Sequence, residues 1–166
     1  MKITVREMTA LDVDIVAKLH AASWRTAYRG MLRDEFLDGD LQSNRRALWS
    51  NRLTNHNPKH VGSIAFVEDR AVGFAFAFVD VDPIWGPMPD NLHVLADCKG
   101  KGVGTALLRS ICAACLQVSA SPGLYLWVYE DNLPACGFYE ALGAQCQDRE
   151  IADAQGGGTV AEWRYS

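Results

Sequence analysis

The chain has no long hydrophobic run, although 49% of its 166 residues are apolar. No uninterrupted apolar stretch approaches the roughly 20 residues that cross a bilayer. The first residues, Met1–Arg6, alternate like a strand and do not form the apolar core of a signal peptide. We therefore expect no membrane partner and a soluble globular protein in the cytoplasm. The length fits one domain, and we expect residues 1–166 to form it.

The chain also lacks an excess of positive charge. Its formal net charge is −4, with 16 Lys and Arg against 20 Asp and Glu, and the basic residues are dispersed. A nucleic-acid partner or an anionic membrane needs a concentrated basic surface. We therefore expect no nucleic-acid partner, and a cationic or neutral ligand is easier to accommodate.

Cysteines are few, odd in number and not spaced for a metal ion. They are Cys98, Cys112, Cys115, Cys136 and Cys146. An odd number without a secretion signal argues against a disulfide framework. Cys112 and Cys115 form a C-x-x-C pair, but no second Cys or His pair lies at zinc spacing. We interpret both as buried structural thiols and expect no metal.

What the sequence does contain is a glycine-rich turn between an expected strand and an expected helix. The apolar segment Leu92–Leu95 leads into Lys99–Thr105, in which every second residue from Gly100 to Gly104 is glycine. Glycine leaves the backbone accessible, and the free N–H groups at a helix N-terminus favour a phosphate. The turn therefore predicts a site for a phosphorylated ligand. Its candidate contacts are the backbone amides of Lys99, Gly100, Lys101, Gly102, Val103, Gly104 and Thr105.

Two common nucleotide motifs do not fit this turn. The pattern G-x-G-x-x-G needs a glycine at Thr105 or Leu107, and the Gly-Lys-Ser/Thr that ends a P-loop is absent. The spacing that fits is Q/R-x-x-G-x-G/A, with Lys99 first and Gly102 and Gly104 after it. Together with its strand, the turn resembles the acetyl-coenzyme A pyrophosphate loop of the GNAT superfamily of N-acetyltransferases. Lysine departs from the usual Gln or Arg, but the backbone amides of the turn are retained.

A second segment strengthens the resemblance. Residues Trp127–Gly143 match the family block W-V-x-x-x-N-x-x-A-x-x-F-Y-x-x-x-G at all seven defined positions. In physical terms, Leu124–Val128 is a buried strand, Asn132 caps a helix, and apolar residues recur on one face of that helix. A strand and an amphipathic helix are common on their own. Two matched blocks in this order are typical of the family, and the resemblance spans almost the whole chain.

The resemblance implies a co-substrate, acetyl-CoA, and several contacts to it. The pantetheine arm and the thioester oxygen would bind main-chain groups of Leu92, His93 and Val94. Asn132 is implied as a further contact, besides its place at the start of a helix. Tyr139 is implied as the general acid that protonates the coenzyme A thiolate. A phenol of pKa ~10 gives its proton to a thiolate of pKa about 8.5 only slightly uphill.

The resemblance does not fix the general base, because Pro89–His93 lacks the glutamate that many relatives carry. The candidates are Asp90 and His93. Strict alternation puts Asp90 on the side of Leu92 and His93 on the other side, so both cannot face one amine. We expect Asp90 to act through water, with His93 or water alone as alternatives. Each also has a structural interpretation, Asp90 as a solvated loop residue and His93 as a half-buried strand residue.

Hydrophobic alternation predicts about seven strands, and helical spacing predicts the helices between them. The expected strands are Ile3–Glu7, Val61–Glu68, Ala71–Val79, Leu92–Leu95, Leu124–Val128, Ala144–Ile151 and Thr159–Tyr165. The expected helices are Ala10–Tyr28, one or two within Arg33–Leu53, Gly102–Gln117 and Leu133–Leu142. We expect Asp82–Pro89 to be a loop and Gln155–Gly158 a flexible hairpin connection.

These elements predict an α/β (α+β) fold, with a mixed, mostly antiparallel central sheet and helices on both faces. The resemblance further implies a GNAT-like splay between the fourth and fifth strands. We expect the acceptor pocket to form at the first helices and the proline-rich loop. Trp24, Tyr28 and Trp85, with Asp80, Asp82 and Asp90, are candidates to line it, but aromatic residues at helical spacing are more often core. Arg33, Arg45, Arg46 and Arg52 are interpreted as a solvated helix face, and the sequence alone does not support a peptide carboxylate ligand among them.

The sequence therefore predicts an N-acetyltransferase that moves acetyl from acetyl-CoA to a primary amine by direct attack in a ternary complex. The acceptor would be a small-molecule amine or a peptide N-terminus. A homodimer would agree with many relatives. Alternatives are a longer acyl-CoA donor and a non-catalytic sensor that binds acyl-CoA. The intact glycine turn opposes a third alternative, a structural protein without a cofactor.

Overall fold

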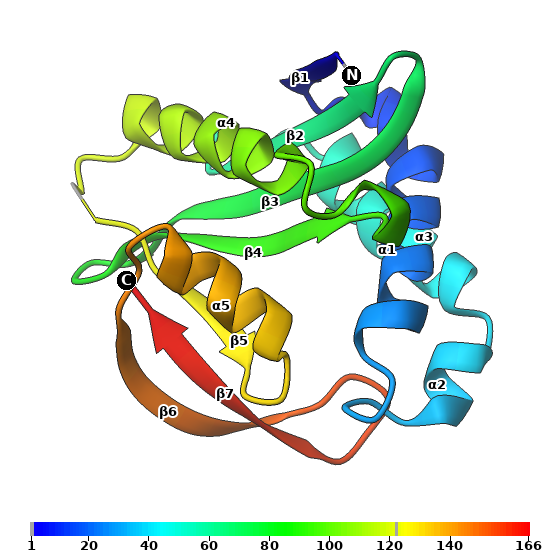
Figure 1. The fold of residues 1–166 in the computed structure, drawn as a ribbon. Coiled ribbons are helices and arrows are strands. Elements are labelled where there is room, and N and C mark those ends of the chain that lie inside the picture. Colours follow the sequence, from blue (N-terminus) through cyan, green and yellow to red (C-terminus); the bar gives the residue numbers. More distant parts are fainter. Residues whose placement is uncertain (1, 122) are drawn as a thin grey trace.

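The strands of the protein form two antiparallel sheets in the computed structural model, which describes residues 2–121 and 123–166 (Figure 1). The larger sheet has the strand order β1-β2-β3-β4 and the smaller one β5-β7-β6. The strands are β1 (Ile3–Glu7), β2 (His60–Val67), β3 (Arg70–Asp82), β4 (Gly86–Val94), β5 (Leu126–Tyr129), β6 (Cys146–Asp153) and β7 (Thr159–Tyr165). Within the described residues no ladder joins β4 to β5, so the sheets part where the splay is predicted.

Helices cover both faces of the larger sheet. They are α1 (Val13–Ala27), α2 (Asp34–Asp38), α3 (Leu41–Thr54), α4 (Val103–Val118) and α5 (Leu133–Ala141), with 3-10 turns at Ala10–Asp12 and Ala96–Cys98. On one face α4 packs Val103, Leu107 and Ile111 against the sheet, and on the other α1 and α3 contribute Val16 and Trp49. Helix α5 packs on the smaller sheet. The predicted fold class and its helices are confirmed.

Strand β3 is central and buried on both faces. Ala75 and Ala77 point toward α4, whereas Phe74 and Phe76 point toward α1 and α3. Small side chains let α4 approach closely, and the large rings fill the space under two helices. A strand covered on both faces has an almost continuous apolar sequence instead of a polar-apolar alternation. This strand is the rigid support on which β4, and with it His93, is placed.

The prediction of a loop over Asp82–Pro89 was wrong for most of that segment. Strand β3 continues to Asp82 and β4 begins at Gly86, so Pro87 and Pro89 lie within a strand. β4 is the edge strand of its sheet, and there a proline without an N–H need not remove a ladder hydrogen bond. Only residues 83–85 form a turn.

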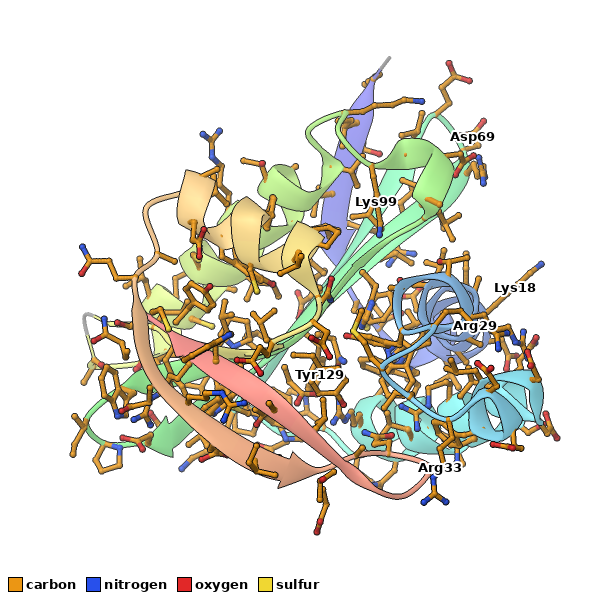
Figure 2. All side chains as sticks on the ribbon, turned by 60° about the horizontal axis from the view of Figure 1, so that its bottom comes forward. Lys18, Arg29, Arg33, Asp69, Lys99 and Tyr129 are labelled. Carbon is orange, nitrogen blue, oxygen red and sulfur yellow. The ribbon has the colours of Figure 1, made fainter. Side chains whose placement is uncertain are left out.

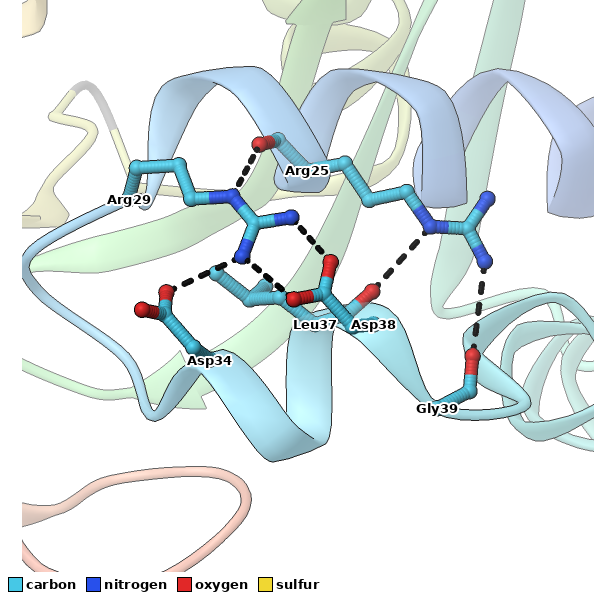
Figure 3. Close-up of polar contacts among 6 residues, drawn as sticks. All are labelled: Arg25, Arg29, Asp34, Leu37, Asp38 and Gly39. Carbon is cyan, nitrogen blue, oxygen red and sulfur yellow. Dashed lines mark hydrogen bonds and ion pairs between the residues drawn. The ribbon is translucent and has the colours of Figure 1, made fainter.

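Arginine side chains hold α2 against the end of α1 (Figure 3). Arg29 pairs with Asp34 at 2.9 Å and also with Asp38. Arg25 donates from Nε to the carbonyl of Leu37 at 3.1 Å. These contacts fix a short helix that its own five residues could not stabilise.

The tip of the β6–β7 hairpin is packed, contrary to the expected flexible connection. Gly156 has a φ of +84°, and a Cβ built there would lie 2.4 Å from Cγ of Phe36. Gln155 accepts a hydrogen bond from Nη2 of Arg45 at 2.7 Å. The hairpin therefore closes onto α2 and α3 through these contacts.

Replacing Gly156 with Ala is expected to lower the free energy of unfolding by about 2 kcal/mol, because the new methyl group meets Phe36 and the left-handed backbone disfavours a side chain. Urea denaturation measures the loss. The matched control is Gly143→Ala, since Gly143 has a φ of +95° and open space around its Cβ. That control carries only the backbone cost, about 1 kcal/mol. Equal losses in the two variants would contradict a packed hairpin tip.

No helix of the described residues is long and apolar enough to cross a membrane. The five cysteines are free, and Cys115 is buried while Cys112 is only partly so. Burial raises the pKa of Cys115 to about 11, which fits an inert structural thiol.

Candidate functional site

A cavity of about 680 Å³ lies where β4 and β5 part. It extends from the glycine turn, near Lys99, to the helices α1 and α3; Figure 2 labels Lys99 and also Tyr129, which lines the cavity from β5. The predicted site residues that line it are Asp90, Leu92, His93, Val94, Lys99, Gly100, Gly102, Gly104, Thr105, Asn132 and Tyr139. The side chains of Lys101 and Val103 point elsewhere, because Lys101 donates to the carbonyl of Asp97 and Val103 is in the core.

The glycine turn presents uncapped amides at the start of α4. Gly102 occupies the N-cap position in the left-handed conformation, with a φ of +85°, and no side chain caps the helix. Its carbonyl accepts the N–H of Ala106 at 3.0 Å. Ala106 is thus the first residue whose N–H donates within the helix, and the N–H groups of residues 103–105 have no partner in it. With the positive end of the helix dipole, they have the donors and the charge that suit an anion.

Strand β4 presents peptide groups to the gap between the sheets. The N–H of Leu95 donates to the carbonyl of Val72 in β3 at 2.9 Å. Because peptide groups alternate in direction along an antiparallel strand, those of His93 also face β3, and those of Leu92 and Val94 face the gap. The geometry therefore favours Leu92 and Val94 as main-chain contacts and turns the peptide groups of His93 away.

A bulge in β4 overturns the alternation expected around Asp90. Pro89 and Asn91 pair with adjacent residues of β3, so Asp90 is an extra residue between them. Asp90 and Asn91 both accept a hydrogen bond from Nη1 of Arg52, each at 2.8 Å. Asp90 thus turns toward α3, on the same side of the strand as His93. The argument that the two side chains cannot face one ligand was wrong, because it assumed an unbroken strand.

His93 is buried and neutral. Nε2 accepts from the indole N–H of Trp24 at 3.3 Å, which places the ring proton on Nδ1, 3.1 Å from Oγ of Ser23. Burial, with smaller effects from Lys99 and Arg45, lowers the pKa of His93 to about 3. An imidazole with both nitrogens engaged and so low a pKa is a poor general base. The geometry favours Asp90 over His93 for that role.

The protein is expected to lose stability in mild acid because of His93. The folded pKa of about 3 lies below the unfolded value of about 6.5, so between these values only the unfolded chain binds the proton. The free energy of unfolding should fall by about 2 kcal/mol from pH 7 to pH 5. Urea denaturation at both pH values tests this. His93→Gln should weaken the pH dependence and the exposed His56→Gln should not; an unchanged dependence in His93→Gln would contradict the assignment.

Two arginines of α3 lie at the cavity, where the sequence predicted a solvated face. Arg45 is 4% exposed, with its guanidinium 4.4 Å from the centre of the Trp24 ring. The Arg52 side chain is 15% exposed. Positions 45 and 52 are two helical turns apart and share one face. The prediction is confirmed for the exposed Arg33 and Arg46 and wrong for Arg45 and Arg52.

Asn132 lies at the start of α5, and Tyr139 lies further along the helix. Asn132 begins the helix, but its side chain makes no capping hydrogen bond, which leaves it available to a ligand. Tyr139 is 9% exposed, and its hydroxyl has no hydrogen-bond partner among the described residues. Burial raises the pKa of Tyr139 above its ordinary value, so the hydroxyl keeps its proton at neutral pH.

The proposed aromatic lining is brought together only in part. Trp24 and Tyr28 line the cavity. Trp85 lies outside it, against the guanidinium of Arg164 at 4.3 Å. Asp82 is also outside, where it accepts from the backbone N–H groups of the 83–85 turn.

Comparison with known proteins then identifies the family. Residues 21–144 match the model described as the acetyltransferase (GNAT) family. The chain belongs to this family. The uncharacterized N-acetyltransferase YuaI of Bacillus subtilis (strain 168) is 28% identical in an alignment of length 145, which covers 84% of this chain and 78% of YuaI. The GNAT chain is thus an acyltransferase, as its two motifs predict.

Solved GNAT structures share the fold. The PaiA N-acetyltransferase from Thermoplasma acidophilum, in complex with coenzyme A, has a TM-score of 0.74 and 17% identity over 98% of each chain. Arabidopsis thaliana NAA60, solved with a bisubstrate analogue, has a TM-score of 0.71 and 16% identity. The alignment covers 99% of this chain and 96% of NAA60. At these identities the likeness concerns the fold, and it confirms the predicted GNAT architecture.

Some residues of the GNAT cavity carried no signal in the sequence. Glu162 of β7 lines it opposite Tyr129 in the β5–β7 ladder, and Gln155 reaches it from the hairpin. Burial, with a smaller effect of Glu150, raises the pKa of Glu162. Their positions depend on β7 lying between β5 and β6, an order that local periodicity does not reveal.

Proposed function

We propose that the protein transfers acetyl from acetyl-CoA to a primary amine by direct attack in a ternary complex, as a single domain. The observation that carries this is one cavity that joins three features: the uncapped amides of α4, the open peptide groups of β4 and the Tyr139 hydroxyl. The PaiA and NAA60 relatives were solved with coenzyme A and acetyl-CoA, which supports this co-substrate.

The residues present fit acetyl-CoA. The pyrophosphate suits the turn Lys99–Thr105, because its backbone amides offer donors at a positive helix end. The arm is an amide-containing chain, which suits the peptide groups of Leu92 and Val94 at the gap. The space around the Cβ position of Gly102 is open, with Ile3 as the nearest atom at 3.9 Å. Asn132 supplies a further polar contact. When bound, acetyl-CoA supplies an activated acyl group as a thioester.

Two side chains move protons in this proposal. Asp90 accepts, through water, the proton that the amine loses as its nitrogen bonds to the acetyl carbon. Tyr139 donates its hydroxyl proton to the sulfur as the C–S bond breaks, and solvent then restores that proton. Tyr139 holds its proton at neutral pH and can donate it, and the burial that raises its pKa makes the transfer to sulfur more uphill than it is for a free phenol.

A weak general base limits the acceptor to amines of low pKa. An amine of pKa ~10.4 is only about 0.04% neutral at pH 7, whereas an amine near 7.8 is roughly 10–15% neutral. Asp90 is a carboxylate already engaged in an ion pair with Arg52, at 2.8 Å. An acceptor of low amine pKa, such as a peptide N-terminus or another α-amine, is therefore favoured.

The test is an initial-rate study of thiol release with acetyl-CoA and a panel of amines. Direct transfer predicts double-reciprocal lines that intersect, and parallel lines would instead indicate an acyl-enzyme. Butyryl-CoA is run beside acetyl-CoA, and a faster reaction would show a longer acyl donor. Tight binding of acetyl-CoA without thiol release from any amine would favour the sensor alternative and contradict the proposed transfer.

A further inference from the structure

We infer that the amine acceptor is a small amino acid whose carboxylate binds Arg45 and Arg52 of α3. This rests on the proposed function, because it names the acceptor class for the same cavity. It goes beyond the motifs, which concern only the coenzyme, and it gives the expected neutral ligand a carboxylate group.

Arg45 is a buried cation that lacks a carboxylate partner. Its Nε donates to Asn44 at 3.0 Å and its Nη2 to Gln155 at 2.7 Å. Its Nη1 is buried without a hydrogen-bond partner, and no ion pair of the described residues includes Arg45. A buried cation left in this state is costly, and a carboxylate that arrives with a ligand would relieve the cost.

Arg52 lies two helical turns further along and lines the same cavity. It donates to Asp90 and Asn91 through Nη1, and the guanidinium lies 5.2 Å from the centre of the Trp49 ring. Among the ion pairs of the described residues, Asp90 is thus the one carboxylate that pairs with either Arg45 or Arg52. Arg45 and Arg52 therefore carry one positive charge more than Asp90 balances, although the whole chain is acidic.

His20 adds another unpartnered donor at the cavity. Its Nδ1 accepts the indole N–H of Trp49 at 3.0 Å, which places the ring proton on Nε2. That Nε2 is buried without a partner, as is Nη1 of Arg45. Burial lowers the pKa of His20 well below its ordinary value, so the ring is neutral. The unpartnered buried atoms of the cavity lining are thus donors, and a carboxylate accepts several hydrogen bonds at once.

The amine end and the size of the acceptor follow from the same geometry. Asp90 is paired with Arg52, so a ligand whose carboxylate meets the arginines brings its amine close to Asp90. The cavity of about 680 Å³ must hold the acyl end of the coenzyme as well as the acceptor. This favours a free amino acid over a longer peptide.

The experiment measures thiol release with saturating acetyl-CoA and matched acceptors: each L-amino acid, its carboxamide and the amine without the carboxyl group. The best amino acid is expected to exceed its carboxamide by about 100-fold in kcat/KM, because a charge-assisted contact is lost in the amide. In Arg45→Gln this preference should fall to about tenfold or less. Arg46→Gln is the matched control, since the neighbouring Arg46 is exposed and pairs with Asp14; it should keep the full preference.

Equal use of amino acids and carboxamides by the natural protein would overturn the inference, even if Arg45→Gln failed to fold. Turnover only of peptides, or only of amines without a carboxylate, would also overturn it. In both cases thiol release would leave the proposed acetyltransferase intact. The proposed function itself fails by different results: the absence of acetyl-CoA binding in thermal unfolding, or binding without thiol release from any amine.

Discussion

Replacing Tyr139 with Phe is expected to lower kcat by about 100-fold or more and to change the affinity for acetyl-CoA by less than about twofold. The ring stays in the apolar cluster between α5 and the smaller sheet, so packing is retained. Only the hydroxyl is lost, and it has no hydrogen-bond partner within the described parts of the chain. Its removal therefore leaves no protein group unsatisfied. The measurement combines steady-state thiol release with calorimetric titration of acetyl-CoA.

The matched control is Tyr125→Phe. Tyr125 is also buried, at 5% exposure, but it does not line the cavity. Its loss of a hydroxyl should leave kcat near that of the natural protein. Unchanged kcat in Tyr139→Phe would remove Tyr139 from proton transfer and leave solvent as the acid.

Replacing Gly102 with Val is expected to weaken acetyl-CoA binding by about 100-fold, or about 2.7 kcal/mol. The φ of +85° at Gly102 is strained for a β-branched residue, so the start of α4 must change its conformation. Gly102 also lines the cavity, so a side chain there adds bulk beside the uncapped amides. Both effects act on the donors that we assign to the pyrophosphate, and calorimetric titration of acetyl-CoA measures the result.

Gly30→Val separates strain from binding. Gly30 has a similar φ of +80° and no atom within 4 Å of its Cβ position, and it is not among the residues that line the cavity. Both variants should lose comparable stability in urea denaturation. Only Gly102→Val should bind acetyl-CoA more weakly; equal affinity in the two variants would contradict the anion site at α4.

The sequence predicted the helices and most strands well, and it also predicted the glycine turn that lines one end of the cavity, because both depend on local patterns. The glycine turn, the strand before it and α4 are contiguous in the chain, and so are β5 and α5. Backbone conformation at Gly102 and helix periodicity in α4 need no information from distant residues. The order of strands in two sheets and the place of Glu162 depend on long-range pairing, which one sequence does not show.

The predictions for Asp90, Arg45 and Arg52 failed for a related reason. The bulge at Asp90 adds one residue to β4, and a single extra residue reverses the side to which a strand residue points. The burial of Arg45 requires α1 beneath it and the β6–β7 hairpin beside it. Composition places arginine on the surface by default, so its position at the cavity becomes visible only in three dimensions.

The most direct measurement is thermal unfolding with and without acetyl-CoA, with NADH and ATP as controls. At a ligand concentration near 100 times Kd, binding adds about 2.7 kcal/mol of stability, which is roughly 5–10 °C for a domain of this size. The account predicts this shift with acetyl-CoA alone among the three ligands. No shift at millimolar acetyl-CoA, or an equal shift with NADH or ATP, would contradict an acetyl-CoA site at the glycine turn and the acetyltransferase built on it.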